Sequence, residues 1–362
     1  MGKPSVSIII PVYQVEKYIG RCLRSVMHQQ GVDFPVECIL VDDASPDGSM
    51  AVAEQLTADY QGSIEFRTAR HEHNRGLSAA RNTGISLATG DYLLFVDSDD
   101  FITDDCLQVL FSAVRQHAGI QVVKGNHKGR VSVDVARIPQ QPLDNDTLLP
   151  LLYMGVIPVM AWNTLVSRSL VEQHHLRFRE GMVYEDNLWS VELFRLTTSF
   201  LFVPQVTYHY EANPESILGN TDVIACPPKY LPYKITIVRE LLDNFDTRHH
   251  VPYTCYLVSH LMQMFDSLGK THPRPLPRGG AAPFPLTPLP SRGGAGVGSV
   301  EVDSSDVKKL RNRLVRLTLK QGRLVLALYE LLLFKPLRCL MRYRWFRHNY
   351  HRIEKITYKL AQ

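Results

Sequence analysis

The sequence lacks the paired or clustered cysteines that would indicate a disulfide framework or a zinc site. Its six cysteines are scattered through 362 residues, with no CxxC pair and no histidines at zinc-ligand spacing. Secreted proteins that depend on disulfides carry cysteines densely, whereas cytosolic proteins keep theirs as thiols. We therefore expect reduced thiols and a cytoplasmic location.

Long apolar runs are also missing. No stretch of about 18 apolar residues occurs, and the first residues, Met-Gly-Lys-Pro-Ser, lead directly into a short strand pattern. A signal peptide needs a basic start followed by an apolar core. The sequence therefore predicts neither a membrane span nor a signal peptide.

Charge is unevenly distributed. The net charge is +4, yet residues 307–362 hold 15 Lys and Arg against two acidic residues, so the preceding part is net acidic. The basic segment surrounds a largely apolar stretch at 324–334 and carries Trp345 and Phe346. This pattern predicts a peripheral anchor for an anionic membrane surface at the inner face of the cell membrane. A helix packed on the domain with a solvated basic face is the alternative. Nucleic acid is not an expected partner, because the acidic body would repel it.

Strand and helix patterns alternate along roughly the first 125 residues. β-branched apolar runs predict strands, and apolar positions at helical spacing predict helices. The expected strands are 5–10, 36–41, 64–67, 92–96 and 120–123, and the expected helices are 15–30, 48–60, 77–88 and 104–117. Such alternation produces right-handed crossovers and a mostly parallel sheet covered by helices on both faces. The predicted fold class is therefore α/β, with a C-terminal helical extension.

The pattern is less regular further on. Helices are expected near 145–155 and 185–197, strands near 161–166 and 200–210, and helical stretches over 228–268. Residues 271–300 contain seven Pro and six Gly, which predicts a disordered linker. The predicted domains are a catalytic domain over 1–215 with halves 1–125 and 126–215, a helical extension over 216–270, the linker over 271–300, and a basic tail over 301–362.

Polar clusters follow three of the predicted strands. Pro11–Tyr13, Asp42-Asp43 and Asp97–Asp100 each come directly after a strand pattern. Ligands of parallel sheets bind beyond the carboxyl ends of the strands. The coincidence of three polar clusters predicts one binding site at this edge of the sheet.

The run Asp97-Ser98-Asp99-Asp100 has two interpretations. Mg²⁺ and Mn²⁺ prefer carboxylate oxygens and keep positions open for substrate phosphates, so the run suits a metal that bridges a diphosphate. Acidic residues also cap helices, and a helix is expected to follow. Three carboxylates after a buried strand exceed what a cap needs, which favours the metal. Asp42-Asp43 is equally open: it suits a nucleobase or ribose, or a turn with Ser45.

Two further polar segments begin predicted helices. In the first, Arg75 and Arg81 are placed to pair with a phosphate or with the acidic site, or to be solvated. In the second, Glu185-Asp186 offers a carboxylate that accepts a proton from a reacting hydroxyl. Favourable charge at a helix N-terminus is the alternative.

Four motifs together resemble the family 2 glycosyltransferases of GT-A fold, in that family's order and spacing. They are Val6–Tyr13, Val41–Ser45, Asn74–Asn82 and Asp97–Asp100. The strong resemblance covers roughly residues 4–125 and continues more weakly through Glu185-Asp186 to about 215.

The resemblance implies an inverting transfer of a sugar from a nucleotide-diphosphate-sugar donor to a hydroxyl of a saccharide or lipid-linked saccharide acceptor, in surface polysaccharide synthesis. It implies a Mn²⁺ or Mg²⁺ cofactor. It also implies a role for each matching residue: donor binding by Pro11, Tyr13, Asp42, Asp43, Arg75, Asp97 and Ser98, metal binding by Asp99, Asp97 and Asp100, and proton abstraction by Asp186 with Glu185 beside it.

Two other functions remain as alternatives. A nucleotidyltransferase is expected to carry a Gly-rich basic phosphate loop near its N-terminus, and none follows the first strand. A non-catalytic nucleotide-binding protein is disfavoured by the intact carboxylates. The QxxRW element of processive polysaccharide synthases is absent from the sequence, which predicts a single-addition enzyme.

Overall fold

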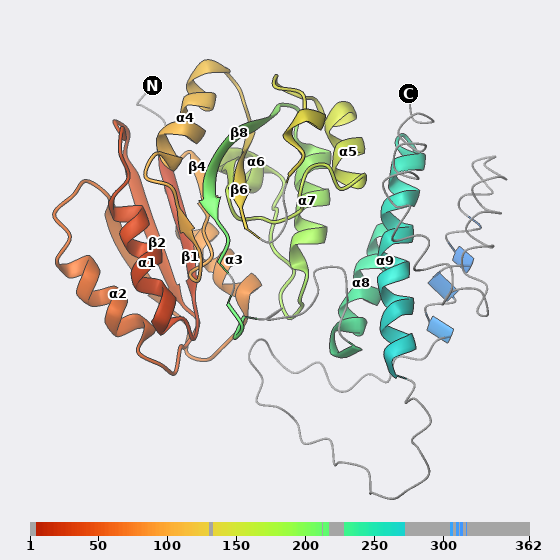
Figure 1. Cartoon of the computed structure of the whole chain (residues 1–362), viewed down its shortest axis with the longest axis horizontal. Helices are drawn as coiled ribbons and strands as arrows, with labels where there is room; N and C mark the ends of the chain where they lie inside the picture. The colour runs from red at the N-terminus through yellow and green to blue at the C-terminus, as the bar shows by residue number, and fades with distance from the viewer. Residues whose placement is uncertain are drawn as a thin grey trace, which may run out of the picture. The chain divides into compact units, whose positions relative to one another are not determined.

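The computed structural model describes residues 5–129, 133–211, 213–216 and 228–271, with seven more between 305 and 316 (Figure 1). The described residues form two compact units: those of 5–149 with those of 156–216, and residues 150–155 with 228–271 and the few described beyond 304. The predicted linker, apart from its first residue, and most of the predicted basic tail lie outside the described residues. The predicted domain boundaries stay a prediction.

The first unit is built on a mixed sheet. Its strands are β1 (Val6–Val12), β2 (Val36–Asp42), β3 (Glu65–Arg70), β4 (Tyr92–Phe95), β5 (Phe101–Ile102), β6 (Val122–Lys128), β7 (Thr164–Ser167) and β8 (Phe200–His209). Their order is β3-β2-β1-β4-β7-β6-β8-β5. β1 pairs in parallel with β2 on one side and with β4 on the other, so Ile9 lies between Ile39 and Phe95. From β1 the chain adds β2 and β3 on one side and then returns to add β4 on the other side. The carboxyl ends of β1 and β4 therefore form the topological switch point at which such sheets bind ligands.

Helices cover both faces of this sheet (Figure 1). The helices of the unit are α1 (Glu16–Met27), α2 (Ser49–Ala58), α3 (Leu77–Leu87), α4 (Cys106–Gln116), α5 (Asn145–Tyr153, which runs into the second unit), α6 (Arg168–Gln173) and α7 (Glu185–Leu196). One face packs with α1, α2 and α4 through residues such as Ile8 and Ile10. The alternate residue, Ile9, points to α3, and a Cβ on Gly84 of that helix would lie 2.3 Å from the Ile9 side chain. A glycine there therefore lets α3 pack closely on β1.

The α/β fold class and the alternating elements are confirmed. The predicted parallel pairing is confirmed for β3-β2-β1-β4, whereas β7 runs antiparallel to both β4 and β6. The two-residue strand β5 and the short helix α6 were not expected, because neither is long enough to show a periodic pattern. The stretch 228–268 divides into α8 (Leu231–Asp243) and α9 (His250–Thr271), where the Asp246 carboxylate accepts hydrogen bonds from the backbone N–H groups of Arg248 and His249.

The second unit contains α8 and α9. Tyr153 packs there on Tyr253, with ring centroids 4.7 Å apart, and its hydroxyl donates to Asp246. Lys234 of α8 and His260 of α9 are both buried, and Lys234 Nζ lies 3.2 Å from His260 Nδ1. Burial, with the Lys234 charge as a lesser cause, holds the pKa of His260 well below its usual value. The helices are therefore joined by a polar contact within an aromatic core.

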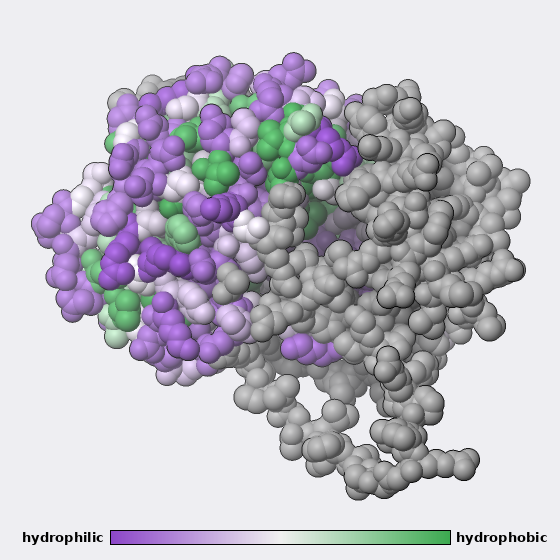
Figure 2. Space-filling model, viewed as in Figure 1, coloured by the Kyte–Doolittle hydropathy of each residue, from purple (hydrophilic) through white to green (hydrophobic). Residues whose placement is uncertain are grey.

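The surface of the described residues is mainly polar. Figure 2 shows hydrophilic side chains over most of the coloured face, with apolar groups in small separate patches. Among the described helices, none combines the length and apolar character that crossing a bilayer requires. The cysteines of this part of the chain, Cys22, Cys38, Cys106 and Cys255, are all thiols.

Glu37 of β2 joins three elements at the amino end of the sheet. Its Oε1 accepts hydrogen bonds from Ser7 Oγ at 2.6 Å and from Thr89 Oγ1 at 2.7 Å, and Oε2 pairs with Arg67 at 2.8 Å. Burial raises the pKa of Glu37, but the hydrogen bonds from Ser7, Thr89 and Arg67 outweigh it and lower that pKa from 4.5 to about 2. The charged carboxylate therefore stabilises the folded state.

Replacing Glu37 by Gln should lower the free energy of unfolding at pH 7 by up to about 3 kcal/mol, since each pKa unit corresponds to about 1.4 kcal/mol. The folded-state pKa is depressed, so this stabilisation is present above about pH 5 and disappears as the pH falls toward 2. Urea unfolding at pH 7, 5 and 3 should show the gap between wild type and Glu37→Gln narrowing. Glu65→Gln, on an exposed edge position, is the matched control. A gap that stays constant with pH would contradict the prediction.

Candidate active site

Two acidic segments and one buried arginine meet beyond the carboxyl ends of β1 and β4. Asp97–Asp100 follows β4, and α3 packs behind β1 and β4 with Arg81 buried at 1% exposure. Helix α7 begins with Glu185-Asp186. These residues lie beyond the carboxyl ends of the strands, at the crevice where α/β sheets bind ligands.

The Arg81 guanidinium connects these segments. Its Nη2 donates to Asp97 Oδ1 at 2.8 Å, and its Nη1 donates to Glu185 Oε1 at 2.8 Å and to Asp186 Oδ1 at 3.0 Å. The Asp97 and Asp186 side chains keep 24% and 19% of their surface exposed, whereas Glu185 keeps 8%. The two more exposed carboxylates are therefore placed to meet a ligand, and Glu185 acts more as an anchor for Arg81.

One guanidinium among three carboxylates leaves the site with excess negative charge. Burial raises the pKa of Asp186, Arg81 lowers it, and the nearby Asp97 raises it again, with a net upward shift. Burial and the Asp186 charge also raise the pKa of Glu185. Carboxyl groups with raised pKa values are stronger bases when ionised.

Packing around α3 fixes where Arg81 lies. Asn82 donates through Nδ2 to the Phe178 carbonyl at 2.9 Å and accepts from the Phe178 N–H at 2.8 Å. The Arg81 guanidinium lies over the Phe178 ring, 5.0 Å from its centroid, and this ring stacks on Trp189 of α7. The sequence left open whether Arg75 and Arg81 are solvated or paired. Arg81 differs from Arg75 because it lies on the face of α3 that meets the sheet.

Helix α7 starts from a strained residue. Tyr184 has φ 66° and ψ 28°, a left-handed conformation that side chains other than glycine seldom adopt. Asn187 supports it, because both its N–H and its Nδ2 donate to the Tyr184 carbonyl, at 3.1 and 3.0 Å. Such strain costs about 1–3 kcal/mol and clusters at functional sites. The turn directs Asp186 toward Arg81 at the first turn of the helix.

The carboxylates of the Asp97–Asp100 run are held from the other side by the end of β8. Tyr208 donates to Asp100 Oδ2 at 2.7 Å, and the Glu211 N–H donates to Asp100 Oδ1, also at 2.7 Å. Asn213 Nδ2 donates to Asp99 Oδ2 at 2.9 Å. Burial, followed by the charges of Asp99 and Asp97, raises the pKa of Asp100 to about 8. Burial and the Asp97 charge also raise that of Asp99.

The donor set suits a hard divalent cation that arrives with a phosphate. Within the described parts of the chain, no three His, Cys, Asp or Glu side chains gather to hold a metal by themselves. Mg²⁺ needs only one or two carboxylates where substrate phosphates complete its shell. Asp97 and Asp99 supply such oxygens, and the excess negative charge favours a cation. Asp100 is the least suited of the three predicted ligands, because both its oxygens already accept hydrogen bonds.

The residues predicted to bind a nucleoside lie beside this crevice. Asp43 accepts hydrogen bonds from the N–H groups of Arg75 and Gly76, at 2.8 and 2.7 Å, and from His71. Asp42 Oδ1 accepts from the Ser45 N–H at 2.8 Å. Both aspartates are buried, so they shape the turn and the loop before α3 in addition to any contact with a ligand.

The remaining predicted residues are spread around the same edge. Pro11 is buried in β1 opposite Val41, and Tyr13 is partly exposed beyond the strand end. Ser98 is buried inside the acidic run. Arg75 is 43% exposed and pairs with Glu180 at 3.2 Å, away from the three carboxylates around Arg81. The structure therefore joins Asp97, Glu185 and Asp186 directly, while the nucleoside residues form a separate side of the crevice.

Lys124 of β6 is a residue that the sequence patterns did not single out. Its Nζ is buried and donates to the Met160 carbonyl at 2.6 Å and to Thr164 Oγ1 at 2.8 Å. Burial lowers the pKa of Lys124 to about 7, against the opposing charge of Asp186. Its bonds hold the segment before β7, whose Ala161 N–H donates to Asp186.

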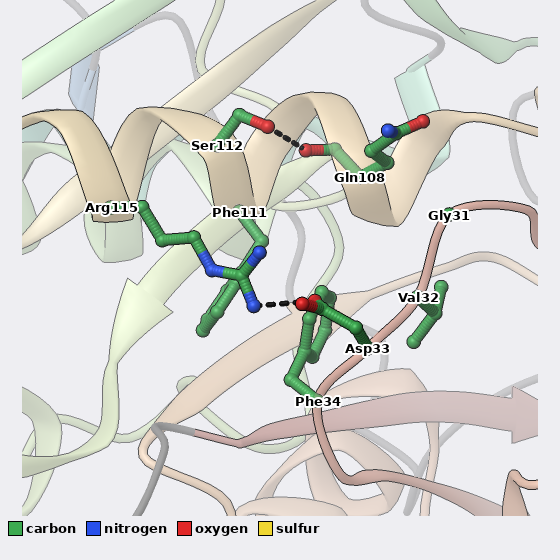
Figure 3. A pocket seen from close by; sticks show the side chains of 8 residues that line it. All are labelled: Gly31, Val32, Asp33, Phe34, Gln108, Phe111, Ser112 and Arg115. Atoms are coloured by element: carbon green, nitrogen blue, oxygen red, sulfur yellow. Dashed lines mark hydrogen bonds and ion pairs between the residues drawn. The ribbon is translucent and has the colours of Figure 1, made fainter.

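A recess of about 410 Å³ lies elsewhere (Figure 3). It is lined by Gly31–Phe34 and by Gln108, Phe111, Ser112 and Arg115 of α4. Arg115 pairs with Asp33, and the Phe34 ring stacks on Phe111 with centroids 4.0 Å apart. Phe34 precedes the start of β2, so this recess belongs to the amino ends of the strands and not to the crevice.

Removing Arg81 should destabilise the fold strongly, because the buried carboxylates would lose their shared cation. We expect Arg81→Met to lower the free energy of unfolding by about 3–5 kcal/mol. The free energy of unfolding of Arg81→Lys should lie between those of wild type and Arg81→Met, since an ammonium keeps the charge but lacks the planar pair of guanidinium donors. Arg177→Met, which breaks a surface pair with Glu172, is the control and should cost about 0–1 kcal/mol in urea unfolding. Equal losses at the two positions would refute the role of Arg81.

Comparison with known proteins gives a consistent family assignment. Residues 7–174 match the model of Glycosyl transferase family 2. EpsH of Bacillus subtilis, described as a glycosyltransferase, is 32% identical over 230 residues, 60% of this chain and 64% of EpsH. A poly(ribitol-phosphate) beta-glucosyltransferase of Bacillus spizizenii is 39% identical over 206 residues, 57% of this chain and 32% of that protein. The chain therefore spans less than two thirds of these relatives.

Solved structures show the same fold. TarS 1–349 of S. aureus in complex with UDP-GlcNAc has a TM-score of 0.57 at 21% identity, covering 74% of this chain and 80% of that one. The mannosyltransferase PcManGT of Pyrobaculum calidifontis, in complex with GDP-Man and Mn²⁺, has a TM-score of 0.51 at 16% identity, covering 74% of each chain. At these identities the likeness concerns the fold, which is of the GT-A type. Residues 7–174, with their strand-end motifs and this architecture, therefore form a domain of the glycosyl transferase family 2 type.

Proposed function

We propose that the chain is an inverting glycosyltransferase that moves a sugar from a nucleotide-diphosphate-sugar to a hydroxyl of a saccharide acceptor. The observation that carries this proposal is the bridge from Asp97 through Arg81 to Asp186. It joins the acidic run after β4, on the donor side, to a carboxylate at the start of α7. A transferase that inverts in one displacement needs both at one crevice: a place for the diphosphate and a base for the acceptor.

The donor is assigned to the edge formed by β1, β2 and β4. Pro11 and Tyr13 would line the base pocket, Asp42 and Asp43 would meet base or ribose, and Arg75 would approach the diphosphate. Asp97 and Ser98 would contact the ribose side of the donor. UDP is the first nucleotide to test, because the TarS structure with this fold is a UDP-GlcNAc complex.

Asp186 is the proposed base. Its carboxylate would accept the proton of the acceptor hydroxyl as the new bond forms between that oxygen and the anomeric carbon, while the bond to the diphosphate breaks. Burial gives Asp186 a raised pKa, which makes its ionised form a better proton acceptor. Arg81 would hold the carboxylate in place, and the Ala161 N–H and the Lys124 charge would keep it ionised. Glu185, being less exposed, is the second choice.

A Mn²⁺ or Mg²⁺ ion is the proposed cofactor, held by Asp97 and Asp99 with Asp100 behind them. When bound, it would neutralise charge on the departing diphosphate. The chain's own contribution is the orientation of Asp97 by Arg81, of Asp99 by Asn213 and of Asp100 by Tyr208.

The acceptor is proposed to be a surface polysaccharide precursor, such as a capsule or lipopolysaccharide saccharide, free or lipid-linked. The support is the teichoic acid-type polymer in the name of one relative. Peripheral attachment of residues 307–362 to an anionic membrane at its cytoplasmic face would bring a lipid-linked acceptor close. A nucleotidyltransferase is the second candidate function. The Gly-rich phosphate loop expected of that class is absent from the sequence after β1.

A screen of nucleotide-sugars with Mn²⁺ tests the donor half of this proposal. Wild type should hydrolyse or transfer from at least one UDP- or GDP-sugar, and chelation by EDTA should abolish this. Asp99→Ala should weaken donor turnover at low Mn²⁺ by about 10–100-fold, and high Mn²⁺ should restore part of it. Asp105→Ala, beyond the run, is the matched control. If no donor is turned over and none binds more tightly with metal, the glycosyltransferase proposal fails.

The base is tested by amide substitutions of the neighbouring carboxylates. Asp186→Asn keeps an oxygen for Arg81 but cannot accept the proton, so transfer should fall by about 10²–10⁴-fold while donor binding stays near wild type. Glu185→Gln should reduce transfer by no more than about tenfold. Single-turnover transfer and calorimetric donor binding measure the two effects. Normal transfer in Asp186→Asn would remove this residue from its role, and the reverse order would assign the base to Glu185.

A further inference from the structure

The segment after β8, which we call the strap, is described at residues 210–211 and 213–216. It runs past the acidic run that follows β4 and contributes two groups to it. The Glu211 N–H donates to Asp100, and the Asn213 side chain donates to Asp99. The strap therefore bonds Asp99 and Asp100, whereas Arg81 bonds Asp97.

The Asn213 amide is fixed at both ends. Its Nδ2 donates to Asp99 Oδ2 at 2.9 Å, and its Oδ1 accepts from the Glu215 N–H, also at 2.9 Å. The residue is 6% exposed. An amide with both groups bonded cannot rotate freely, so it gives Asp99 a donor in one defined direction.

Helix α1 anchors the strap. Arg21 Nη1 pairs with Glu211 at 2.9 Å, and its Nη2 donates to the Asp99 carbonyl at 3.3 Å. Lys17 pairs with Glu215 at 3.3 Å. These exposed ion pairs are individually weak, but together with the two carboxylate bonds they give the strap one location.

We propose that Asn213 is the positioning residue of Asp99, fixing the direction in which this carboxylate meets a divalent cation. Asp97, Asp99 and Asp100 lie within four residues and repel one another. Of these, Asp97 is held by Arg81, and Asp100 is held by Tyr208 and Glu211. Asn213 holds Asp99, and partners of this kind, one step behind a metal, orient the ligand that they bond. The inference rests on the proposed metal-dependent function and adds to it the residue that prepares the ligand.

The test measures metal binding and not activity. UDP binding to the full chain is followed by calorimetry at a series of Mn²⁺ concentrations, which gives the Mn²⁺ concentration for half-maximal enhancement of UDP affinity. GDP is run in parallel. Asn213→Ala should raise that concentration by about 10–100-fold. Affinity for UDP extrapolated to saturating Mn²⁺ should remain near wild type, since Asn213 is not assigned a contact with the nucleotide.

Two further variants separate the bond from Asn213 to Asp99 from two other interactions of the strap: the bond from the Glu215 N–H to Asn213, and the surface ion pair of Glu215 with Lys17. Asn213→Ser retains a side-chain oxygen for the turn to the Glu215 N–H but is too short to hold Asp99. It should therefore behave like Asn213→Ala. Glu215→Gln removes the ion pair with Lys17 and should leave the Mn²⁺ dependence unchanged. Thermal unfolding without metal should show all three variants folded.

The outcomes distinguish this inference from the function on which it rests. If wild-type binding of UDP and GDP does not depend on Mn²⁺, the metal-dependent function fails and the inference fails with it. If wild type responds to Mn²⁺ and Asn213→Ala responds at the same concentration, only the role of Asn213 is overturned. Restoration of wild-type behaviour by Asn213→Ser would overturn it too, by showing that the turn alone matters.

Discussion

The buried Arg81 guanidinium is the interaction on which the rest of this site depends. Its partners come from the loop after β4 and from the start of α7, separated from Arg81 by 16 and by 104–105 residues in the sequence. Removing a guanidinium from water is costly unless charged acceptors meet it in good geometry, as the three carboxylates do at the two Nη atoms of Arg81. The helix that carries Arg81 therefore packs stably only when the acidic run and α7 are both in place. The acidic run and the start of α7 are for this reason assembled together.

The same interaction leaves the site with an excess of carboxylates, which would favour a cation. Arg81 neutralises one charge, yet Asp97, Glu185 and Asp186 surround it, and Asp99 and Asp100 follow within three residues of Asp97. The folded chain relieves this excess through hydrogen-bond donors: Tyr208 and the Glu211 N–H at Asp100, and Asn213 at Asp99. Donors of this kind orient carboxylates but do not remove their charge. A divalent ion with a diphosphate does both, which links the electrostatics of the free protein to the proposed donor.

The sequence predicted which polar segments lie at the carboxyl edge of the sheet, because that placement follows from local patterns. Strands with apolar runs, and polar residues directly after them, are visible within windows of ten residues, and parallel sheets place their carboxyl ends along one edge. The burial of Arg81 could not be obtained in this way. Whether an arginine on α3 is solvated depends on α7 and on Phe178, about 100 residues further along, and no local period reports such a contact.

Asp42 and Asp43 illustrate the opposite limit. Their position after β2 predicted a polar role correctly in kind, but the sequence left open whether the partner is a ligand or the backbone. In the structure Asp43 accepts three hydrogen bonds, from His71, Arg75 and Gly76, and so holds the loop that leads into α3. A residue that shapes the loop before α3 also influences where Arg81 lies, about one helical turn into α3. Structural and binding roles are therefore not exclusive at this strand end.

An aromatic stack packs between the strand that leads into the acidic run and the helix that carries the proposed base. Phe95, two residues before Asp97, meets Phe178 and Trp189 edge-on with ring centroids 5.3 and 5.9 Å away, and Phe178 stacks on Trp189 at 4.0 Å. Trp189 lies three residues after Asp186, on the same side of α7. A smaller side chain in this stack would let α7 shift toward β4. In the proposed transfer, such a shift would change the separation of Asp97 and Asp186 and so slow the reaction.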